Sequence, residues 1–243
     1  MTVVRANIES AGYKGRAEVI RDIRFEVGPG ELVGLIGPNG AGKSTTIKAL
    51  LGLLPEVKGE IAFGGGDGDG DGDGEPHYAY IPEHPVLYED LTLWEHLELA
   101  ASAMGLSDAD FRERAEELLV RYRLTEVRHH LTSSFSKGMQ QKIMLILGFL
   151  HRAELYIVDE PFIGLDPRAI RDFLAMLNRE RERGAGVLMS THVLDTAEKI
   201  CSSFLLMSEG SIVAQGTLDD IRRACGLPQA SLFDCFTALT EGA

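Results

Sequence analysis

Long hydrophobic runs, paired cysteines and an excess of positive charge are all missing from this sequence of 243 residues. The longest nearly continuous apolar stretch, Ile143 to Leu150, falls far short of the roughly 20 apolar residues that span a bilayer. The N-terminus also lacks the basic segment followed by an apolar segment that marks a secretory signal. We therefore expect a soluble chain that is not secreted.

The sequence has only three cysteines, Cys201, Cys225 and Cys235, and none of them forms a Cys-x-x-Cys pair. An odd number without that spacing argues against a disulfide framework and against a zinc site. The cysteines are therefore interpreted as packing residues in a reducing compartment.

Positive charge is scarce, because the formal net charge is -13. A chain of this charge repels a phosphate backbone unless it carries a local basic patch. The densest run of arginines, in segment 179–183, alternates with glutamates and is interpreted as a solvated helix end. No nucleic-acid partner is predicted.

What the sequence does contain is an alternation of strand and helix patterns. An apolar run from Glu31 to Ile36 stops at a glycine-rich turn, after which apolar residues recur at helical spacing as far as Pro55. The same order returns at Leu155–Val158 and again at Val187–Ser190. This alternation of strands and helices predicts an α/β fold with a mostly parallel sheet.

Two segments depart from that alternation. Between the two halves, segment 86–150 carries helix patterns and no strand pattern, so it is predicted to form a helical subdomain. Segment 64–76 consists mainly of alternating Gly and Asp, which cannot build a core, and is predicted to be a flexible acidic loop. Calcium binding is the alternative, but Tyr78 stands where an EF-hand loop requires a bidentate Glu.

A phosphate-binding loop is predicted between the first apolar strand and its helix. The P-loop pattern is satisfied by Gly37, Pro38, Asn39, Gly40, Ala41, Gly42, Lys43 and Ser44. Its glycines let consecutive N–H groups turn toward phosphates at a helix N-terminus, where Lys43 would reach the β- and γ-phosphates. Ser44 would offer its hydroxyl to Mg²⁺, and Thr45 and Thr46 follow within reach of the nucleotide.

Two adjacent carboxylates end the second apolar strand, at Asp159 and Glu160. Downstream of a P-loop, the first is predicted to lie beside the Mg²⁺ ion, and the second near the water that attacks the γ-phosphate. Glu160 is therefore the predicted catalytic base, acting with Lys43.

The run Phe135 to Gln141 resembles the signature motif of ABC ATPases, usually L-S-G-G-Q, with Lys137 and Met139 at two of its positions. Ser136 stands where a helix would begin, so its hydroxyl, the Gly138 N–H and the helix dipole can face a γ-phosphate. In the family that phosphate is held by the other subunit.

The remaining motifs of the ABC ATPases follow in the family's order, so the resemblance covers nearly the whole chain. It implies that Tyr13 stacks on adenine, that 163–166 forms the D-loop with Asp166, and that His192 is the switch histidine, with a catalytic role. It also implies one ABC ATPase domain over 1–243, in which an N-terminal antiparallel β subdomain and the inserted helical subdomain flank the P-loop core.

One position departs from the family pattern, because Glu83 stands where the Q-loop usually carries glutamine. A glutamate can coordinate Mg²⁺ or hold water, so Glu83 joins Ser44 and Asp159 as a predicted metal ligand. ATP and Mg²⁺ are the predicted cofactors.

The segments 81–99, 135–142 and 159–167 are most similar to the ATPase of Ecs-type bacterial ABC exporters. The resemblance implies that two copies of the chain close on ATP and power a separate integral-membrane permease, from the cytoplasmic face of the membrane. About 50 residues follow His192, too few for the regulatory domain of many importer ATPases, which favours export. A ribosome- or DNA-acting ABC protein would carry two P-loops, and a GTPase switch would carry N-K-x-D; this sequence has neither.

Overall fold

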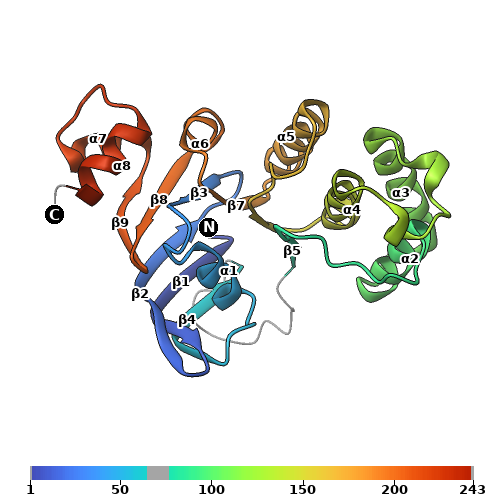
Figure 1. Ribbon diagram of the computed structural model, residues 1–243, viewed down its shortest axis with the longest axis horizontal. Coiled ribbons are helices and arrows are strands. Elements are labelled where there is room, and N and C mark those ends of the chain that lie inside the picture. Colours follow the sequence, from blue (N-terminus) through green and yellow to red (C-terminus); the bar gives the residue numbers. More distant parts are fainter. Residues whose placement is uncertain (1, 65–76, 242–243) are drawn as a thin grey trace.

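The computed structural model describes residues 2–64 and 77–241. Two lobes are visible in Figure 1: one contains both β-sheets, and the other, at the right of the view, contains only helices. Nearly all of the predicted acidic loop, 64–76, lies outside the described residues, and so does the calcium alternative for that loop.

A six-stranded sheet forms the centre of the larger lobe, in the order β5-β6-β7-β3-β8-β9. The strands span Tyr78–Ile81 (β5), Leu155–Asp159 (β6), Gly186–Thr191 (β7), Leu32–Ile36 (β3), Ser203–Ser208 (β8) and Ser211–Gly216 (β9). All pairs are parallel except the last, in which β9 runs antiparallel to β8. Strands β3, β6 and β7 are buried along their whole length, as their nearly unbroken apolar sequences require of a sheet covered on both faces.

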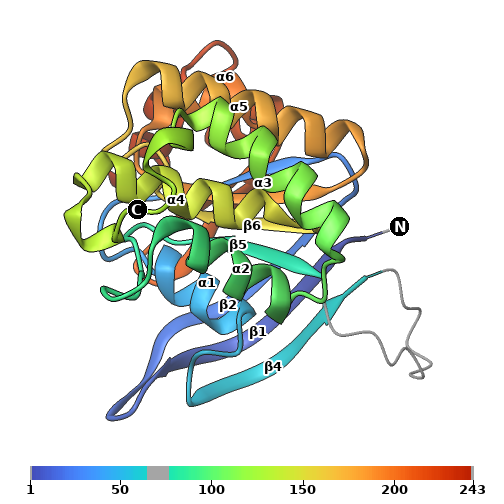
Figure 2. The same ribbon diagram turned by 90° about the vertical axis from the view of Figure 1, so that its right-hand side faces the viewer.

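A second, antiparallel sheet has the order β2-β1-β4 and lies along the lower side of Figure 2. Its strands are β1 (Val4–Tyr13), β2 (Arg16–Val27) and β4 (Glu56–Phe63). Buried and exposed residues alternate along the first half of β1, because only one face of this sheet packs on the core. Helix α1 (Lys43–Leu50) shares one apolar cluster with both sheets, through residues such as Ile8, Ile47 and Ile157.

Three helices make up the smaller lobe, namely α2 (Leu93–Ala103), α3 (Asp108–Tyr122) and α4 (Lys137–Leu150), with 3₁₀ turns at Thr125–Val127 and Thr132–Ser134. Helix α2 begins with a capping box of Thr92 and Glu95, and Ser107 caps α3. Leu97, Leu118 and Phe149 are fully buried in the cluster that joins this lobe to the sheet.

Four helices follow in the second half of the chain: α5 (Pro167–Glu182), α6 (Leu194–Ile200), α7 (Leu218–Cys225) and α8 (Leu232–Glu241). The predicted fold is confirmed, with a mostly parallel core sheet, an N-terminal antiparallel sheet and an inserted group of helices. Within the described residues, none of the helices combines the length and apolarity that crossing a bilayer requires.

The predicted solvated end of the helix over 179–183 is wrong for one residue. Glu180 is fully buried, and its carboxylate accepts a hydrogen bond of 2.7 Å from Arg114 of α3 and another from Arg183. A carboxylate is tolerated in such a place only when it is paired and hydrogen-bonded. The segment of alternating charges therefore contains one buried carboxylate, and its ion pair with Arg114 connects α5 to the helical lobe.

Candidate functional site

The loop 37–42 connects β3 to α1 in a conformation that only glycine allows at several positions. Gly40 and Gly42 have φ angles of 84° and 109°, in the region that side-chain-bearing residues rarely adopt. A Cβ atom on Gly42 would lie 2.7 Å from Ile20 Cγ2, and one on Gly37 would lie 2.4 Å from the Met207 carbonyl oxygen. The loop is thus pressed against β2 and β8, and it starts α1 with its N–H groups at a helix N-terminus, the end that favours anions.

Lys43 is buried under this loop. Its Nζ donates to the carbonyl oxygens of Gly37 (2.8 Å) and Pro38 (3.3 Å) and lies 3.5 Å from Glu160 Oε1. A buried ammonium must be compensated in this way. The partners are two neutral carbonyls and one carboxylate, so oxygen atoms of an anionic ligand can take their place.

Asp159 and Glu160 lie at the carboxyl end of β6, where Asp159 is in register with Ser190 of β7. The Ser190 hydroxyl donates to Asp159 Oδ1, and the Glu160 N–H lies 3.1 Å from Ser190 Oγ and 3.2 Å from the Ser190 carbonyl oxygen. Both acids are buried. Ser190 therefore fixes the carboxylate of Asp159 and the backbone of Glu160, a role that the sequence reasoning missed because nothing local to Ser190 indicates it.

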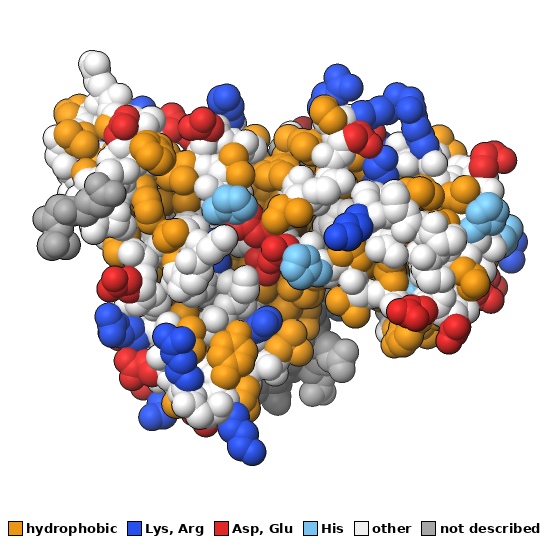
Figure 3. Space-filling view, in the orientation of Figure 1, with side chains coloured by type: hydrophobic (Ala, Val, Ile, Leu, Met, Phe, Trp, Pro, Cys, Tyr) orange, Lys and Arg blue, Asp and Glu red, His pale blue; other side chains and the backbone are white. Residues whose placement is uncertain are grey.

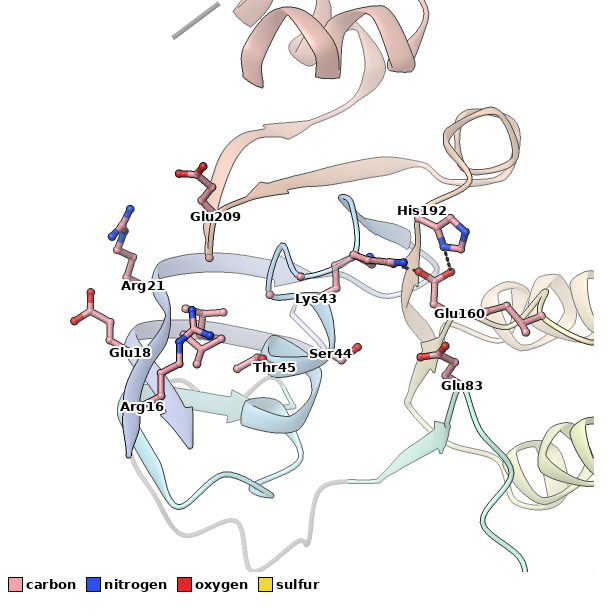
Figure 4. A pocket seen from close by; sticks show the side chains of 17 residues that line it. Arg16, Glu18, Arg21, Lys43, Ser44, Thr45, Glu83, Glu160, His192 and Glu209 are labelled. Carbon is pink, nitrogen blue, oxygen red and sulfur yellow. Dashed lines mark hydrogen bonds and ion pairs between the residues drawn. The ribbon is translucent and has the colours of Figure 1, made fainter. Parts of the chain in front are cut away.

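The Glu160 carboxylate is the point on which the predicted catalytic residues converge (Figure 4). Its Oε2 lies 3.0 Å from His192 Nδ1 and its Oε1 faces Lys43, but Oε1 has no hydrogen-bond partner among the described residues. The φ angle of Glu160 is 47°, a value that costs a non-glycine residue about 1–3 kcal/mol and that persists mainly at functional sites. His192 reaches this carboxylate from the end of β7 and is about half exposed.

These side chains open into a cavity of about 670 Å³, which is lined by the P-loop, β2 and the turn after β8. Acidic and histidine side chains gather in the hollow between the lobes in Figure 3. Glu83, which follows β5, also lines the cavity and is drawn below Glu160 in Figure 4. In β5, burial raises the pKa of Tyr80 to about 12, and the carboxylates of Asp159 and Glu83 add to this effect.

The other end of the cavity carries charges that the sequence reasoning did not single out. Arg16, Glu18 and Arg21 from β2 and Glu209 from the β8–β9 turn line it (Figure 4). No motif marked them, because they reach the cavity only through the packing of β2 beside β9. Tyr13 itself is outside the lining. Its hydroxyl lies 3.5 Å from Thr45 Oγ1, and Lys48 Nζ lies 5.6 Å from its ring centroid.

Among the predicted residues outside the lining of this cavity, which also include Asp159, the residues Ser136, Gly138 and Asp166 come from the signature segment and the D-loop. They lie together instead. Ser136 caps α4 by accepting a hydrogen bond from the Met139 N–H, and a Cβ atom on Gly138 would lie 3.0 Å from the Gly164 carbonyl oxygen. The signature segment and the D-loop thus share one surface, and Ile163 of the D-loop also lines the cavity beside the P-loop.

Asp166 links this surface to α4. It caps α5 through the N–H groups of Arg168 and Ala169, and its Oδ2 accepts a 2.8 Å hydrogen bond from Lys142 Nζ. The Lys142 hydrogen bond, followed by the Ala169 N–H, lowers the pKa of this carboxyl.

Comparison with known proteins assigns a family to this geometry. The profile of the ABC transporter family matches residues 20–163. The chain is 52% identical to the uncharacterized ABC transporter ATP-binding protein YthP of Bacillus subtilis, over 99% of this chain and 98% of that protein. It is 44% identical to the ABC-type transporter ATP-binding protein EcsA of the same organism, again over 99% and 98%.

A solved structure, described as the ATP-binding subunit of an ABC transporter, superposes with a TM-score of 0.91 and 48% sequence identity, covering 98% of this chain and 100% of that one. The likeness therefore includes the whole architecture as well as the motifs. This chain belongs to the ABC transporter family and is one of its ATP-binding subunits.

Proposed function

We propose that two copies of this chain bind ATP and Mg²⁺ between them, and that hydrolysis of the ATP drives a separate integral-membrane permease which exports its cargo. The observation that carries this proposal is the convergence of Lys43 and His192 on the carboxylate of Glu160, at a cavity bounded by the P-loop. A carboxylate oxygen without a hydrogen-bond partner is available there to accept one from water.

The residues present fit a triphosphate. The cavity is within the roughly 300–1,000 Å³ typical of small-molecule sites. Lys43 would exchange the carbonyls of Gly37 and Pro38 for phosphate oxygens, while the P-loop N–H groups and the N-terminus of α1 attract the negative charge. Ser44, Asp159 and Glu83 would hold Mg²⁺, which would supply positive charge to neutralise the phosphate oxygens.

In hydrolysis, Glu160 would orient the attacking water by accepting its hydrogen bond at Oε1. His192 holds the opposite carboxylate oxygen, and Ser190 fixes the backbone on which the carboxylate is mounted. The attacking water would then be positioned by the Glu160 carboxylate, whose own orientation is set by His192 and by the backbone that Ser190 holds.

A second copy is needed because the signature residues Ser136 and Gly138 lie outside the cavity of their own chain. The N-terminus of α4, capped by Ser136, is a second anion-attracting helix end. Pairing two copies about a twofold axis would bring this helix end to the γ-phosphate held by Lys43 of the other copy, and symmetry would give two such sites.

Contact with the permease would be made at the junction of the lobes, on the cytoplasmic face of the membrane. Gln141 of α4 donates a 3.4 Å hydrogen bond to the Pro82 carbonyl oxygen, next to Glu83 in the cavity wall. A movement of α4, which begins in the signature segment, would therefore displace Glu83 and the exposed segment after it. The direction, export, rests on the resemblance to Ecs-type exporters.

The experiment that tests the pairing combines two inactive variants, Ser136→Ala and Lys43→Ala. Each alone is expected to be inactive, whereas a mixture of the two forms heterodimers with one intact composite site, which should recover part of the ATPase activity. As a control, a chain carrying both changes mixed with itself should recover none. Activity of Ser136→Ala alone at the wild-type level would contradict the composite site.

The permease is tested by purification from detergent-solubilised membranes. The tagged native chain is expected to retain a multi-span membrane protein, and its Glu83→Ala variant to hydrolyse ATP with weaker stimulation by that partner. Recovery of the native chain only in the soluble fraction, or only with ribosomes, would contradict the transporter proposal.

A further inference from the structure

A second, smaller cavity of about 190 Å³ lies where the end of α3, the middle of α4 and the start of α5 meet. It is distinct from the ATP cavity, with which it shares no lining residue. Four cationic side chains line it: Arg121, Arg123, Lys142 and Arg168. Figure 3 shows Lys and Arg side chains gathered over the edge of the molecule between α5 and α3, in a protein whose net charge is strongly negative.

Two of the lining residues each carry a buried polar atom that has no hydrogen-bond partner among the described residues, namely Arg121 Nε and the Tyr122 hydroxyl oxygen. Tyr122 is almost fully buried. A buried polar atom without a partner is costly and uncommon in folded proteins. The guanidinium Nε can only donate, and the phenol can donate as well, so the missing partner is an acceptor.

Cationic side chains outnumber acidic ones in the lining of this cavity. Its two acidic lining residues are Asp166, which binds Lys142, and Asp172, which lies 3.8 Å from Arg168. Glu117, outside the lining, lies 3.6 Å from Arg121 but also pairs with Arg114 and Arg179. Four cations therefore face two carboxylates across the cavity.

We propose that this cavity binds a small tetrahedral oxyanion of the phosphate type. Its volume of about 190 Å³ is large enough for one such ion. Arginine and lysine side chains bind phosphate through charge-assisted hydrogen bonds, and the N-terminal end of α5 adds favourable electrostatics. The ion would supply the acceptor that Arg121 and Tyr122 lack, and it would compete with Asp166 for Lys142.

Competition between the ion and Asp166 for Lys142 would couple this cavity to the D-loop and the signature segment. Asp166 is the residue at the end of the D-loop, and Lys142 holds it against α4, six positions after the signature serine. An ion that draws Lys142 away would loosen the D-loop from the signature helix, so the occupancy of this cavity and the geometry of the signature surface are linked.

The test uses inorganic phosphate as the probe and the Lys43→Ala variant as the starting protein, so that the P-loop responds little. Its melting temperature is measured against phosphate concentration, with chloride replaced to keep the ionic strength constant. We expect a saturable rise. Adding Arg123→Gln and Arg168→Gln should weaken the phosphate response by about tenfold or more, because charge-assisted hydrogen bonds are lost.

The matched control removes the same charge from α3 and α5 by Arg112→Gln and Arg171→Gln, which are exposed and do not line the cavity. This pair is expected to keep the phosphate response. Tyr122→Phe should weaken the response without lowering the melting temperature in phosphate-free buffer, since it removes a hydroxyl that has no partner. The absence of a saturable response in Lys43→Ala, equal loss in the control pair, or full phosphate affinity in Tyr122→Phe would overturn the proposal.

Discussion

Replacing Glu160 with glutamine preserves the shape of the side chain and removes its charge. The amide oxygen can still accept a hydrogen bond from His192 Nδ1, now 3.0 Å from the carboxylate, so the local geometry should persist. What is lost is the ability to take a proton from water, and general bases typically contribute about 10²–10⁴ in rate. We therefore expect turnover to fall by about 10²–10⁴, or roughly 3–5 kcal/mol in activation free energy.

The same change should alter stability in a way that ATP reverses. Lys43 and Glu160 are both buried and 3.5 Å apart, so Glu160→Gln leaves the ammonium with the two carbonyls of Gly37 and Pro38 only. Partial loss of compensation for a buried group costs about 1–3 kcal/mol, less than the 3–5 kcal/mol of a pair broken completely. Bound phosphates restore the compensation. ATP should therefore raise the melting temperature more in Glu160→Gln than in the wild type.

Three measurements check this prediction: steady-state phosphate release, equilibrium ATP binding and melting temperature with and without ATP and Mg²⁺. ATP binding should be retained, and a stable ATP-bound pair should accumulate because the product is formed so slowly. Glu182→Gln, an exposed change of the same chemistry on α5, should behave as the wild type. Near-normal turnover in Glu160→Gln, together with near-normal turnover in Asp159→Asn, would refute the assignment of the site.

Three further predictions concern other parts of the chain. Lys43→Ala should lose ATP affinity, because it removes the charge that faces the β- and γ-phosphates, whereas His192→Ala should mainly lose rate; equal ATP affinity in the wild type and Lys43→Ala would contradict the P-loop assignment. Replacing the aspartates of 64–76 by serine should leave ATPase activity intact, and a calcium-dependent rise in melting temperature that disappears in this variant would show instead that the segment binds calcium. Lys142 lowers the pKa of Asp166, so the ionised Asp166 carboxylate stabilises the fold above the pKa that it has in the unfolded chain. This stabilisation is lost as the pH falls through the lower pKa of the folded state. The difference in melting temperature between the wild type and Asp166→Asn should therefore shrink on acidification.

The sequence predicted those features that depend on neighbouring residues. The largely apolar strands β3, β6 and β7 are typical of a sheet that is buried on both faces, and each was recognised from its own composition. The glycine-rich turn between β3 and α1 was predicted from its P-loop pattern, and Gly40 and Gly42 adopt positive φ angles there. The motifs also placed Lys43 at the start of the helix after β3 and Glu160 directly after β6, near the carboxyl edge of the sheet, where functional residues of parallel sheets gather.

Tertiary structure alone decided which of those ends meet. The sheet order places β7 between β6 and β3, although the three strands are far apart in the sequence, so Ser190 lies against Asp159 and His192 reaches Glu160. No local pattern encodes such neighbours. The charged wall of the ATP cavity and the buried ion pair of Arg114 and Glu180 arose in the same way, because each unites segments whose separate patterns suggest only solvated surface. A sequence determines which residues favour a turn, a strand or a buried face locally. The partner of each charge depends instead on long-range packing, because packing brings together side chains that are far apart in the sequence.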